Sequence, residues 1–343
     1  MPVTRRVLLK LAGAAGAMAV APAVVRAQKL EKTQVHIAVG GKALIYYLPL
    51  SIAEQRGYFK DEGLDVTISD FSGGSKALQA VVGGSADVCS GAYEHTINLQ
   101  SKGQFYRAFA LQGRAPMIVL GVSSKLGYKN PADLKGKNIG VTAPGSSTSM
   151  LVNFFLAKHG MKPSDVSFIG VGSGAGAVTA LRSGQVDAIS NLDPVMSALE
   201  TAGDITVAVD TRKLKDTLDI FGGNMPAGCL YTSQAFLDAN PNTAQALANA
   251  IVRADKWIQQ ASPEDVAKVV PASYLLGEPE VYKASLAKSK EGISPDGRFP
   301  EDGPATALKA LRSYVEFDET KIDLSKTWTN DFVARANEKY PNG

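Results

Sequence analysis

Short, mostly apolar runs alternate with amphipathic stretches along most of the chain. Residues 35–39 and 118–122 are typical of buried strands, and residues 64–69 alternate apolar and polar positions, as a half-buried strand does. Residues 48–57 have a proline near their start and a glycine at their end, which indicates a helix. Strands that alternate with helices of this length predict β-α-β units and a mostly parallel sheet.

The alternation continues to residue 233 and then gives way to helices. It predicts further strands at 86–90, 106–111, 138–141, 166–171, 186–190, 205–209 and 228–233. It predicts further helices at 77–82, 93–103, 150–160 and from 194 onward, and a strongly helical segment after 233. We expect 118–122 to lead into a second lobe, 228–233 to return to the first, and the C-terminal helices to pack on the first.

One unit of sequence occurs twice, as GSKALQAVVGGSADV at 74–88 and GAGAVTALRSGQVDA at 174–188. The copies match, 100 positions apart, at Gly74 and Gly174, Ala77 and Ala177, Ala80 and Ala180, Gly84 and Gly184, and Asp87 and Asp187. Each copy supplies one strand-loop-helix element to one lobe, and in open parallel sheets ligands lie beyond the carboxyl ends of the strands. The repeat therefore predicts two lobes that face one cleft, although generic α/β packing would also produce such a pattern.

The length of 343 residues suggests more than one domain. We predict an α/β protein with two lobes, mostly parallel central sheets and a hinge. Lobe I comprises 28–120 together with 226–343, lobe II comprises 121–225, and residues 1–27 form an export signal.

The first 27 residues have the pattern of a signal peptide. A basic head is followed by an apolar run at 11–25, which is too short to cross a bilayer as a helix, and by a small residue, Ala27, after which we expect cleavage. Arg5 and Arg6 resemble a twin-arginine signal. An amphipathic or buried N-terminal helix is the alternative. Export predicts a soluble protein in the periplasm, an oxidising compartment.

The charge of the predicted mature chain excludes one class of partner. The full chain has 36 basic and 33 acidic residues, and removal of the signal takes away four basic residues and no acidic one, which leaves −1. Nucleic-acid binding would need a basic excess, so no nucleic acid is expected as a partner. Cys89 and Cys229 are the only cysteines, and buried free thiols are favoured over a disulfide.

The loops after the predicted strands are rich in glycine and hydroxyl groups. The candidate ligand-binding residues on these loops are Ser72, Gly73, Gly74 and Ser75, Ser90 and Gly91, Gly145, Ser146, Ser147 and Thr148, and Ser173 and Gly174. Backbone N–H groups at a helix N-terminus, together with such hydroxyls, suit a small anion without any lysine. Simple helix capping is the alternative for each loop taken alone.

Six further candidates flank these loops. They are Tyr46, Tyr47, Tyr93, Glu94, Arg114 and Asp193. Glu94 and Asp193 either cap helices or point into the cleft, where a carboxylate would favour an amine or ring N–H of a ligand, as in a zwitterion. Arg114 could hold an acid group through two hydrogen bonds or form a surface or interlobe ion pair. Tyr46 and Tyr47 either close over the apolar part of a ligand or pack beneath the loop.

Motifs of catalysis and metal binding are missing from the sequence. His36, His95 and His159 are scattered, and there is no HExxH, CxxC, GxSxG or Walker lysine. No catalytic residue, metal or cofactor is therefore predicted.

With the loops placed, five segments match a known family in their order along the chain. They are LSIAEQRGYFKDEGLDVTI, FSGGSKALQAVVGGSADV, DLKGKNIGV, PGSSTSMLVNFFLAKHGM and ALRSGQVDAI. Over roughly residues 34–260 the chain resembles the periplasmic substrate-binding proteins of bacterial ABC importers, and among them the taurine, alkanesulfonate and nitrate binders of the SsuA/THI5-like, NMT1-like family. The family also includes a fungal-type pyrimidine synthase, whose cysteine-rich stretch is absent here.

The resemblance implies a type II periplasmic-binding-protein fold that closes on a solute. It implies reversible binding of a small anionic organic solute, such as a sulfonate or related acid, with a membrane ABC permease as partner and no enzymatic activity. A monomer is expected. The alternatives are a secreted enzyme that acts on a pyrimidine-type vitamin precursor and a ligand-sensing partner of a membrane receptor.

Overall fold

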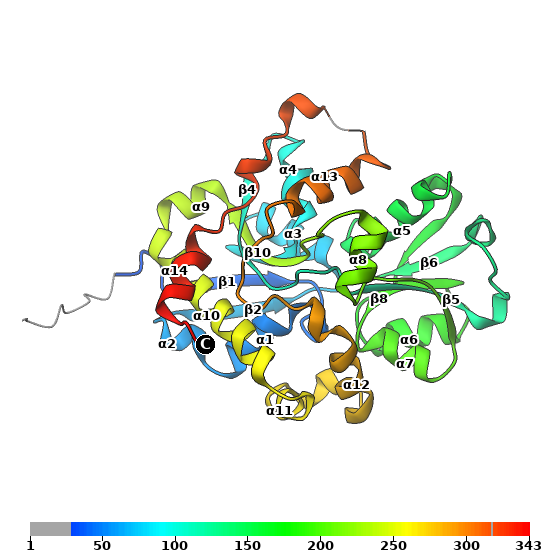
Figure 1. Cartoon of the computed structure of the whole chain (residues 1–343), viewed down its shortest axis with the longest axis horizontal. Coiled ribbons are helices and arrows are strands. Elements are labelled where there is room, and N and C mark those ends of the chain that lie inside the picture. Colours follow the sequence, from blue (N-terminus) through cyan, green and yellow to red (C-terminus); the bar gives the residue numbers. More distant parts are fainter. Residues whose placement is uncertain (1–28, 317) are drawn as a thin grey trace, which may run out of the picture.

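The computed structural model describes residues 29–316 and 318–343, and the predicted signal at 1–27 lies outside them. The chain forms two α/β lobes, each built on one five-stranded sheet (Figure 1). We call lobe I the part built on the sheet of β1 (Gln34–Val39), β2 (Asp65–Asp70), β3 (Val88–Ala92), β4 (Tyr106–Leu111) and β10 (Gly228–Ser233). Lobe II is built on β5 (Ile118–Ser123), β6 (Asn138–Val141), β7 (Ser167–Gly170), β8 (Ala188–Leu192) and β9 (Ile205–Asp210).

The two sheets have the same topology. Their strand orders are β2-β1-β3-β10-β4 and β7-β6-β8-β5-β9. In each sheet the fourth strand is antiparallel to both neighbours, so the other four strands point the same way. The predicted pair of mostly parallel sheets is confirmed, as are the entry of 118–122 into the second sheet and the return of 228–233 to the first. The division at residues 120 and 226 remains a prediction, and β5 begins two residues before the first boundary.

Helices flank both sheets. Lobe I carries the 3₁₀ turn η1 (Ile45–Tyr47), α1 (Leu48–Gln55), α2 (Tyr58–Asp61), α3 (Gly74–Val82) and α4 (Glu94–Gln100). Lobe II carries α5 (Ser147–Lys158), α6 (Ala175–Arg182), α7 (Val195–Thr201) and α8 (Leu214–Phe221). The C-terminal part adds α9 (Gln234–Ala239), α10 (Pro241–Gln260), α11 (Pro263–Val269), α12 (Pro279–Ser289), α13 (Gly303–Arg312) and α14 (Asp331–Lys339).

The glycines of the repeat end its two helices in the same way. Gly84 and Gly184 adopt φ values of +78° and +77°, a left-handed conformation that glycine reaches without steric cost. The next N–H then bonds back to the carbonyl of Ala80 or Ala180, at 2.9 and 3.0 Å. Because this turn uses the residues predicted to open the following strands, β3 and β8 begin two residues later than predicted.

The aspartates of the repeat join each turn to a neighbouring strand, β1 in lobe I and β6 in lobe II. The Asp87 carboxylate accepts the N–H of His36 at 2.9 Å, and the Asp187 carboxylate accepts the N–H of Asn138 at 2.9 Å. The backbone N–H groups of both aspartates donate to the same two partners. The matched positions of the repeat therefore have a structural role in both lobes, while the loop before each helix faces the other lobe.

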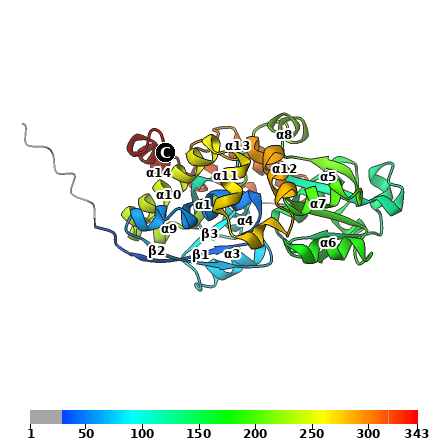
Figure 2. The same ribbon diagram turned by 90° about the horizontal axis from the view of Figure 1, so that it is seen from below.

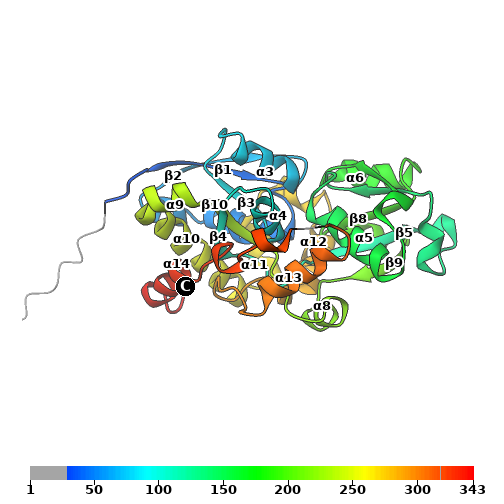
Figure 3. The ribbon, with the colours of Figure 1, turned by 90° about the horizontal axis from the view of Figure 1, so that it is seen from above.

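The C-terminal helices divide between the lobes. The long helix α10 packs on α1, α2, β4 and α14 of lobe I, as predicted. The expectation for α12 was wrong, because α12 packs on α7 of lobe II and its last residue, Ser289, donates to Asp193 at 2.8 Å. Helix α13 contacts both α4 and α5. Figures 2 and 3 show α12 and α13 at the boundary of the lobes.

A search of the described residues for a helix both long enough and apolar enough to cross a bilayer finds none.

Candidate functional site

A buried cavity lies where the two lobes meet. We call it the interlobe cavity. Its lining comes from both lobes, from both crossings between them and from α13. The lining residues are Tyr46, Glu94, Pro116, Ile118, Ser147, Met150, Leu151, Phe154, Phe221, Met225, Pro226, Ala227, Ala310, Leu311 and Tyr314. Its free volume is about 30 Å³, roughly enough for two water molecules. A larger solute can therefore enter only if the lobes or the lining side chains move apart.

Helix α5 contributes a whole face to the cavity. Ser147, Met150, Leu151 and Phe154 lie on it with the spacing of one helical face. The helix is apolar on most of its sides, because it also packs against β8 and β5 of its own sheet. One side thus supports lobe II while another is presented to lobe I. Phe154 stacks on Phe221 with a centroid distance of 4.7 Å, which forms one wall.

Glu94 is the only acidic residue in the described lining of the cavity. The chain leaves β3 at Ala92, and Glu94 is the first residue of α4, so the end of a strand positions its carboxyl at the cavity. The residue is 4% exposed. The backbone N–H of Glu94 bonds the carboxyl group of the same residue. No side chain within residues 29–316 and 318–343 bonds this carboxyl group. Burial raises the pKa of Glu94 to about 7.

Tyr46 and Ser147 connect the two lobes beside Glu94. Tyr46 lies on η1 of lobe I, and its phenol lies close to the side chain of Ser147, the first residue of α5. The Tyr47 ring packs edge-on against the Tyr46 ring at 4.7 Å, which fixes the orientation of Tyr46. Burial raises the pKa of Tyr46 well above its ordinary value, so this phenol stays neutral and can donate.

The floor of the cavity is formed by the two segments that cross between the lobes. Pro116 and Ile118 lie where the chain enters lobe II, and Met225, Pro226 and Ala227 lie where it returns. A rotation about these crossings would change the shape of the cavity directly.

The loops at the N-termini of α3 and α5 touch each other. The Ser75 backbone N–H donates to Ser146 Oγ at 3.0 Å, and Ser75 Oγ donates to the Pro144 carbonyl at 2.9 Å. A Cβ atom on Gly73 would lie 2.8 Å from the Cβ of Ala143, so glycine is needed for this close approach. The helix tips that we expected to bind a ligand together do face each other, but in this closed arrangement they bond each other and the cavity lies beside them.

Three of the eighteen predicted ligand-binding residues line the cavity: Tyr46, Glu94 and Ser147. Ser72 is exposed, and Gly74 lies within the contact between the two loops. Gly145 lies against Ser75 in the same contact, and Ser173 lies against Gly41. Gly174 precedes α6, outside the cavity.

Four other predicted residues have internal partners. Ser90 Oγ accepts from Gln112 at 2.9 Å, and Gly91 packs against the Tyr231 ring. The Tyr93 hydroxyl bonds Thr327, and the Thr148 hydroxyl accepts the N–H of Thr142 at 3.1 Å. These side chains therefore stabilise the lobes themselves.

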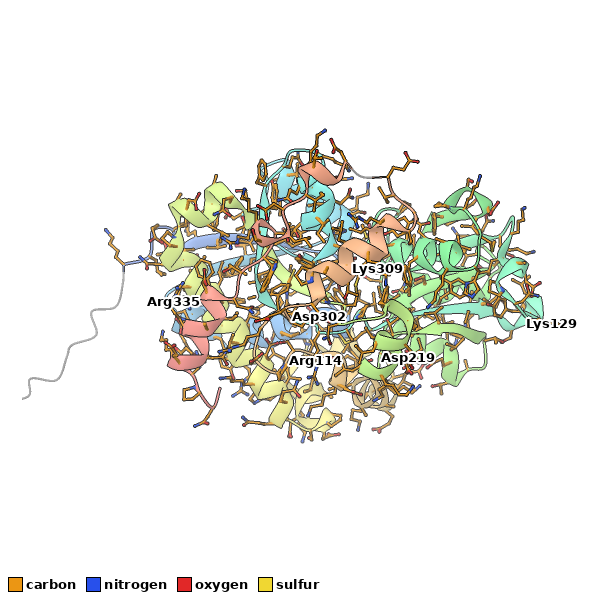
Figure 4. All side chains as sticks on the ribbon, turned by 45° about the horizontal axis from the view of Figure 1, so that its top comes forward. Arg114, Lys129, Asp219, Asp302, Lys309 and Arg335 are labelled. Carbon is orange, nitrogen blue, oxygen red and sulfur yellow. The ribbon has the colours of Figure 1, made fainter. Side chains whose placement is uncertain are left out.

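Arg114 lies outside the cavity. Its Nε donates to the Glu291 carbonyl at 2.9 Å, and its backbone N–H donates to the Gly292 carbonyl at 2.8 Å. Arg114 thus ties the start of the lobe crossing to the turn after α12. Figure 4 labels Arg114, as well as Asp302 at the start of α13 and Lys309 farther along that helix. Asp302 accepts from Asn224 at 2.9 Å and so holds the returning crossing against α13.

Asp193 is buried in an ion-pair network of lobe II. It is 1% exposed, caps α7 through the N–H of Ser197 at 2.9 Å, and lies 3.4 Å from Arg212. Arg212 also pairs with Glu200 and Asp210, at 2.6 Å each. Burial raises the pKa of Asp193, and Arg212 opposes that rise. We expected Asp193 either to cap a helix or to point into the cleft, and its described contacts are those of a helix cap.

The chemistry that these groups offer is binding by hydrogen bonds and apolar contact. Cys89 and Cys229 are free and buried, as predicted. Burial raises the pKa of the Cys89 thiol to about 12, which leaves it unreactive at neutral pH. Among the described residues no group of three or more His, Cys, Asp or Glu side chains could hold a metal ion.

The sequence analysis missed the apolar part of the lining. Met150, Leu151 and Phe154 lay within a predicted helix, and its apolar character on both sides was a usable signal that it faces two partners. Leu311 and Tyr314, from α13 and just after it, gave no such signal. They reach the cavity because the C-terminal segment folds back between the lobes.

Solved structures share this architecture. A protein of Bordetella bronchiseptica RB50 with a solved structure is 75% identical to this chain, with a TM-score of 0.91, over 92% of this chain and 100% of that one. The alkanesulfonate-binding protein SsuA from Xanthomonas axonopodis pv. citri, solved bound to MOPS, is 21% identical with a TM-score of 0.66, over 88% of this chain and 100% of that one. At 21% identity the likeness shows the fold, and the predicted periplasmic-binding-protein fold is confirmed.

Curated relatives include both binding proteins and enzymes. "Putative binding protein YtlA" of Bacillus subtilis (strain 168) is 25% identical over 260 residues, 74% of this chain and 75% of that protein. The 4-amino-5-hydroxymethyl-2-methylpyrimidine phosphate synthase of Candida albicans (strain WO-1) is 24% identical over 297 residues, 84% of this chain and 78% of that one. A family model described as NMT1/THI5 like matches residues 45–265, more than half of the chain.

Proposed function

The chain belongs to the NMT1/THI5-like family, and from that premise we propose that it is the solute-binding component of an ABC importer. It holds one small organic solute reversibly in the interlobe cavity. The observation that carries this proposal is the position of the cavity, which is lined by both lobes and by both crossings between them. Interfaces between domains are preferred sites for small ligands, and a hinge at the floor lets such a site open and close.

Hydrogen bonds between the lobes beside the cavity suit reversible closure. They include hydrogen bonds between neutral groups: the Ser75 N–H with Ser146 Oγ at 3.0 Å, and the Ile45 N–H with the Asp193 carbonyl at 3.0 Å. Each such bond contributes about 0.5–1.5 kcal/mol, because water replaces it when the lobes part. A bound solute can therefore shift the balance between open and closed forms by its contacts with both lobes.

An anionic group on the solute would have one favourable place in the cavity. Ser147 opens the twelve-residue helix α5, whose N-terminus carries a partial positive charge. No Lys or Arg belongs to the described lining. A sulfonate or carboxylate would thus be held by the helix N-terminus and by the hydroxyls of Ser147 and Tyr46, as the loop composition predicted.

Binding without chemical change is favoured over catalysis. The relative from Candida albicans is named as a synthase, so an enzyme that acts on a pyrimidine-type compound is the second candidate. The described lining offers Glu94, Ser147 and tyrosine hydroxyls, with no nucleophile hydrogen-bonded to a base. Recovery of the solute from the protein unchanged, by mass spectrometry, would separate the two.

The partner and the compartment are part of the proposal. We infer that the exported protein works in the periplasm as a monomer and passes its solute to a membrane ABC permease. The support is the pattern of residues 1–27 and the binding proteins among its relatives.

The test is a thermal-shift screen of sulfonates, nitrate, aromatic acids and pyrimidines, followed by small-angle X-ray scattering with the best hit. We expect a hit to raise the melting temperature and reduce the radius of gyration. Ser147→Ala should weaken its binding by about 1–3 kcal/mol through the lost hydrogen bond to a charged group, while the exposed Ser72→Ala serves as a matched control. A hit that binds both variants equally well would place the site elsewhere.

A further inference from the structure

The Glu94 carboxyl has no side-chain partner in the place where the solute would lie. It is buried, it lines the cavity, and no described side chain bonds it. Building on the proposed function, we propose that the solute carries an N–H donor or an ammonium group, and that this group binds the Glu94 carboxylate. A buried carboxylate whose one donor is its own backbone N–H is costly in the empty protein, so a ligand that supplies a further donor recovers part of that cost on binding.

The groups around Glu94 leave its charge uncompensated. The titratable groups that interact electrostatically with Glu94 are the phenols of Tyr46, Tyr47, Tyr93 and Tyr314 and the thiol of Cys229. Burial raises the pKa of each of them, so all are neutral near pH 7. The adjacent His95 is neutral there as well, since burial lowers its pKa to about 4. Glu94 is thus the group at the cavity that changes charge between pH 6 and 8.

The rest of the cavity lining indicates the chemical character of the remainder of the solute. Met150, Phe154, Phe221, Met225 and Leu311 present thioether, aromatic and aliphatic surfaces. Such walls suit a small apolar or aromatic body, and methionine adapts to irregular shapes. The structure therefore assigns a solute with an apolar body, an N–H group toward Glu94 and, where it has an acid group, that group toward Ser147.

The pH dependence of affinity separates this solute from a plain acid. With a pKa of about 7, the ionised fraction of Glu94 rises about ten-fold from pH 6 to pH 8. A cationic group that needs the carboxylate should bind more tightly at pH 8. An acid without a donor faces repulsion from the same carboxylate, so it should bind more tightly at pH 6 and take up a proton on binding.

The experiment is calorimetric titration with three probes, benzylamine, 4-(aminomethyl)benzoate and benzoate, at pH 6 and pH 8. The first two carry an ammonium group at both pH values, and the third shares the ring and acid group without it. We expect the affinity of benzylamine to rise about ten-fold between the two pH values, and that of benzoate to fall. Glu94→Gln should remove both pH effects, and Glu280→Gln, at a side chain that is 86% exposed, should leave them unchanged.

The outcomes separate this inference from the proposed function. Benzoate that binds and closes the lobes, with no gain from the aminomethyl group at pH 8, would overturn the inference and leave solute binding intact. Failure of all three probes to bind would also overturn it, and the wider screen would then judge the proposed function by itself. The pH dependence of the unmodified protein decides the matter even if Glu94→Gln does not fold.

Discussion

Two buried carboxyl groups occupy corresponding places in the two lobes, and they have opposite surroundings. Glu94 follows β3 and Asp193 follows β8, and each of these strands is third in the spatial order of its sheet. Both are almost fully buried, at 4% and 1% exposure. Asp193 is bonded by Ser197, Ser289 and Arg212, whereas no described side chain bonds Glu94.

The difference teaches how a duplicated framework separates structure from function. Both lobes use the end of the third strand to place an acid at the boundary between lobes. In lobe II the surrounding segments supply every partner that the acid needs, so Asp193 stabilises the fold and ties α12 to the lobe. In lobe I no described side chain bonds Glu94, so a ligand that supplies a donor would gain binding free energy from this carboxyl.

The largest expected effect is on the stability that Asp193 gains from its partners. Arg212→Met would leave Asp193, Glu200 and Asp210 without their shared cation, and we expect the free energy of unfolding to fall by about 3–5 kcal/mol. Urea denaturation at pH 7 measures it. The control is Arg182→Met, which removes a half-exposed pair with Asp204 and should cost at most about 1 kcal/mol. Equal losses in the two variants would show that the Arg212 network has no special weight.

The second largest effect concerns Glu94 and is measured as the pH dependence of the free energy of unfolding. The folded pKa of Glu94 is about 7 against an ordinary 4.5, so its ionisation opposes folding. The contribution of Glu94 to stability is therefore complete below pH 4.5 and is lost as the pH rises through 7. Relative to Glu94→Gln, the stability of the wild type should fall by about 2–3 kcal/mol between pH 5 and pH 8.5. Urea unfolding at the two pH values is the measurement, with Glu280→Gln as the exposed control. Parallel pH profiles of wild type and Glu94→Gln would mean that the carboxyl has a partner in solution.

The smallest effect measures one partner of Asp193 alone. Ser289→Ala removes a hydroxyl that donates to the Asp193 carboxylate at 2.8 Å, and it should cost about 1–2 kcal/mol of unfolding free energy. Ser285→Ala is closely matched, since Ser285 is equally buried on the same helix but donates to the Val281 carbonyl. We expect a smaller loss there. Thermal unfolding that ranks the two variants the other way would remove Ser289 from the group of partners that compensates Asp193.

Much of the framework could be predicted from the sequence because its causes are local. Alternating patterns placed most strands within two residues, and the glycines of the repeat predicted where α3 and α6 end. The C-terminal helices were harder, since an amphipathic helix such as α12 requires an apolar neighbour without saying which lobe provides it. Of the residues that line the interlobe cavity, Tyr46, Glu94 and Ser147 were among the predicted candidates, while Phe154 and Tyr314 were not. The role of these residues in binding stays a prediction.

By itself the sequence determined two α/β lobes, their duplicated strand-loop-helix unit, the relation to the NMT1/THI5-like family, and the loops from which a site could be built. These follow from short-range patterns, since side-chain periodicity and backbone preferences act over a few residues. Only the tertiary structure decided which acid is satisfied and which faces the cavity. A carboxyl at the end of a strand suits a cap and a ligand equally well, and its role depends on whether segments about twenty to a hundred residues away, such as Arg212 and Ser289 for Asp193, bring it a partner in the absence of water.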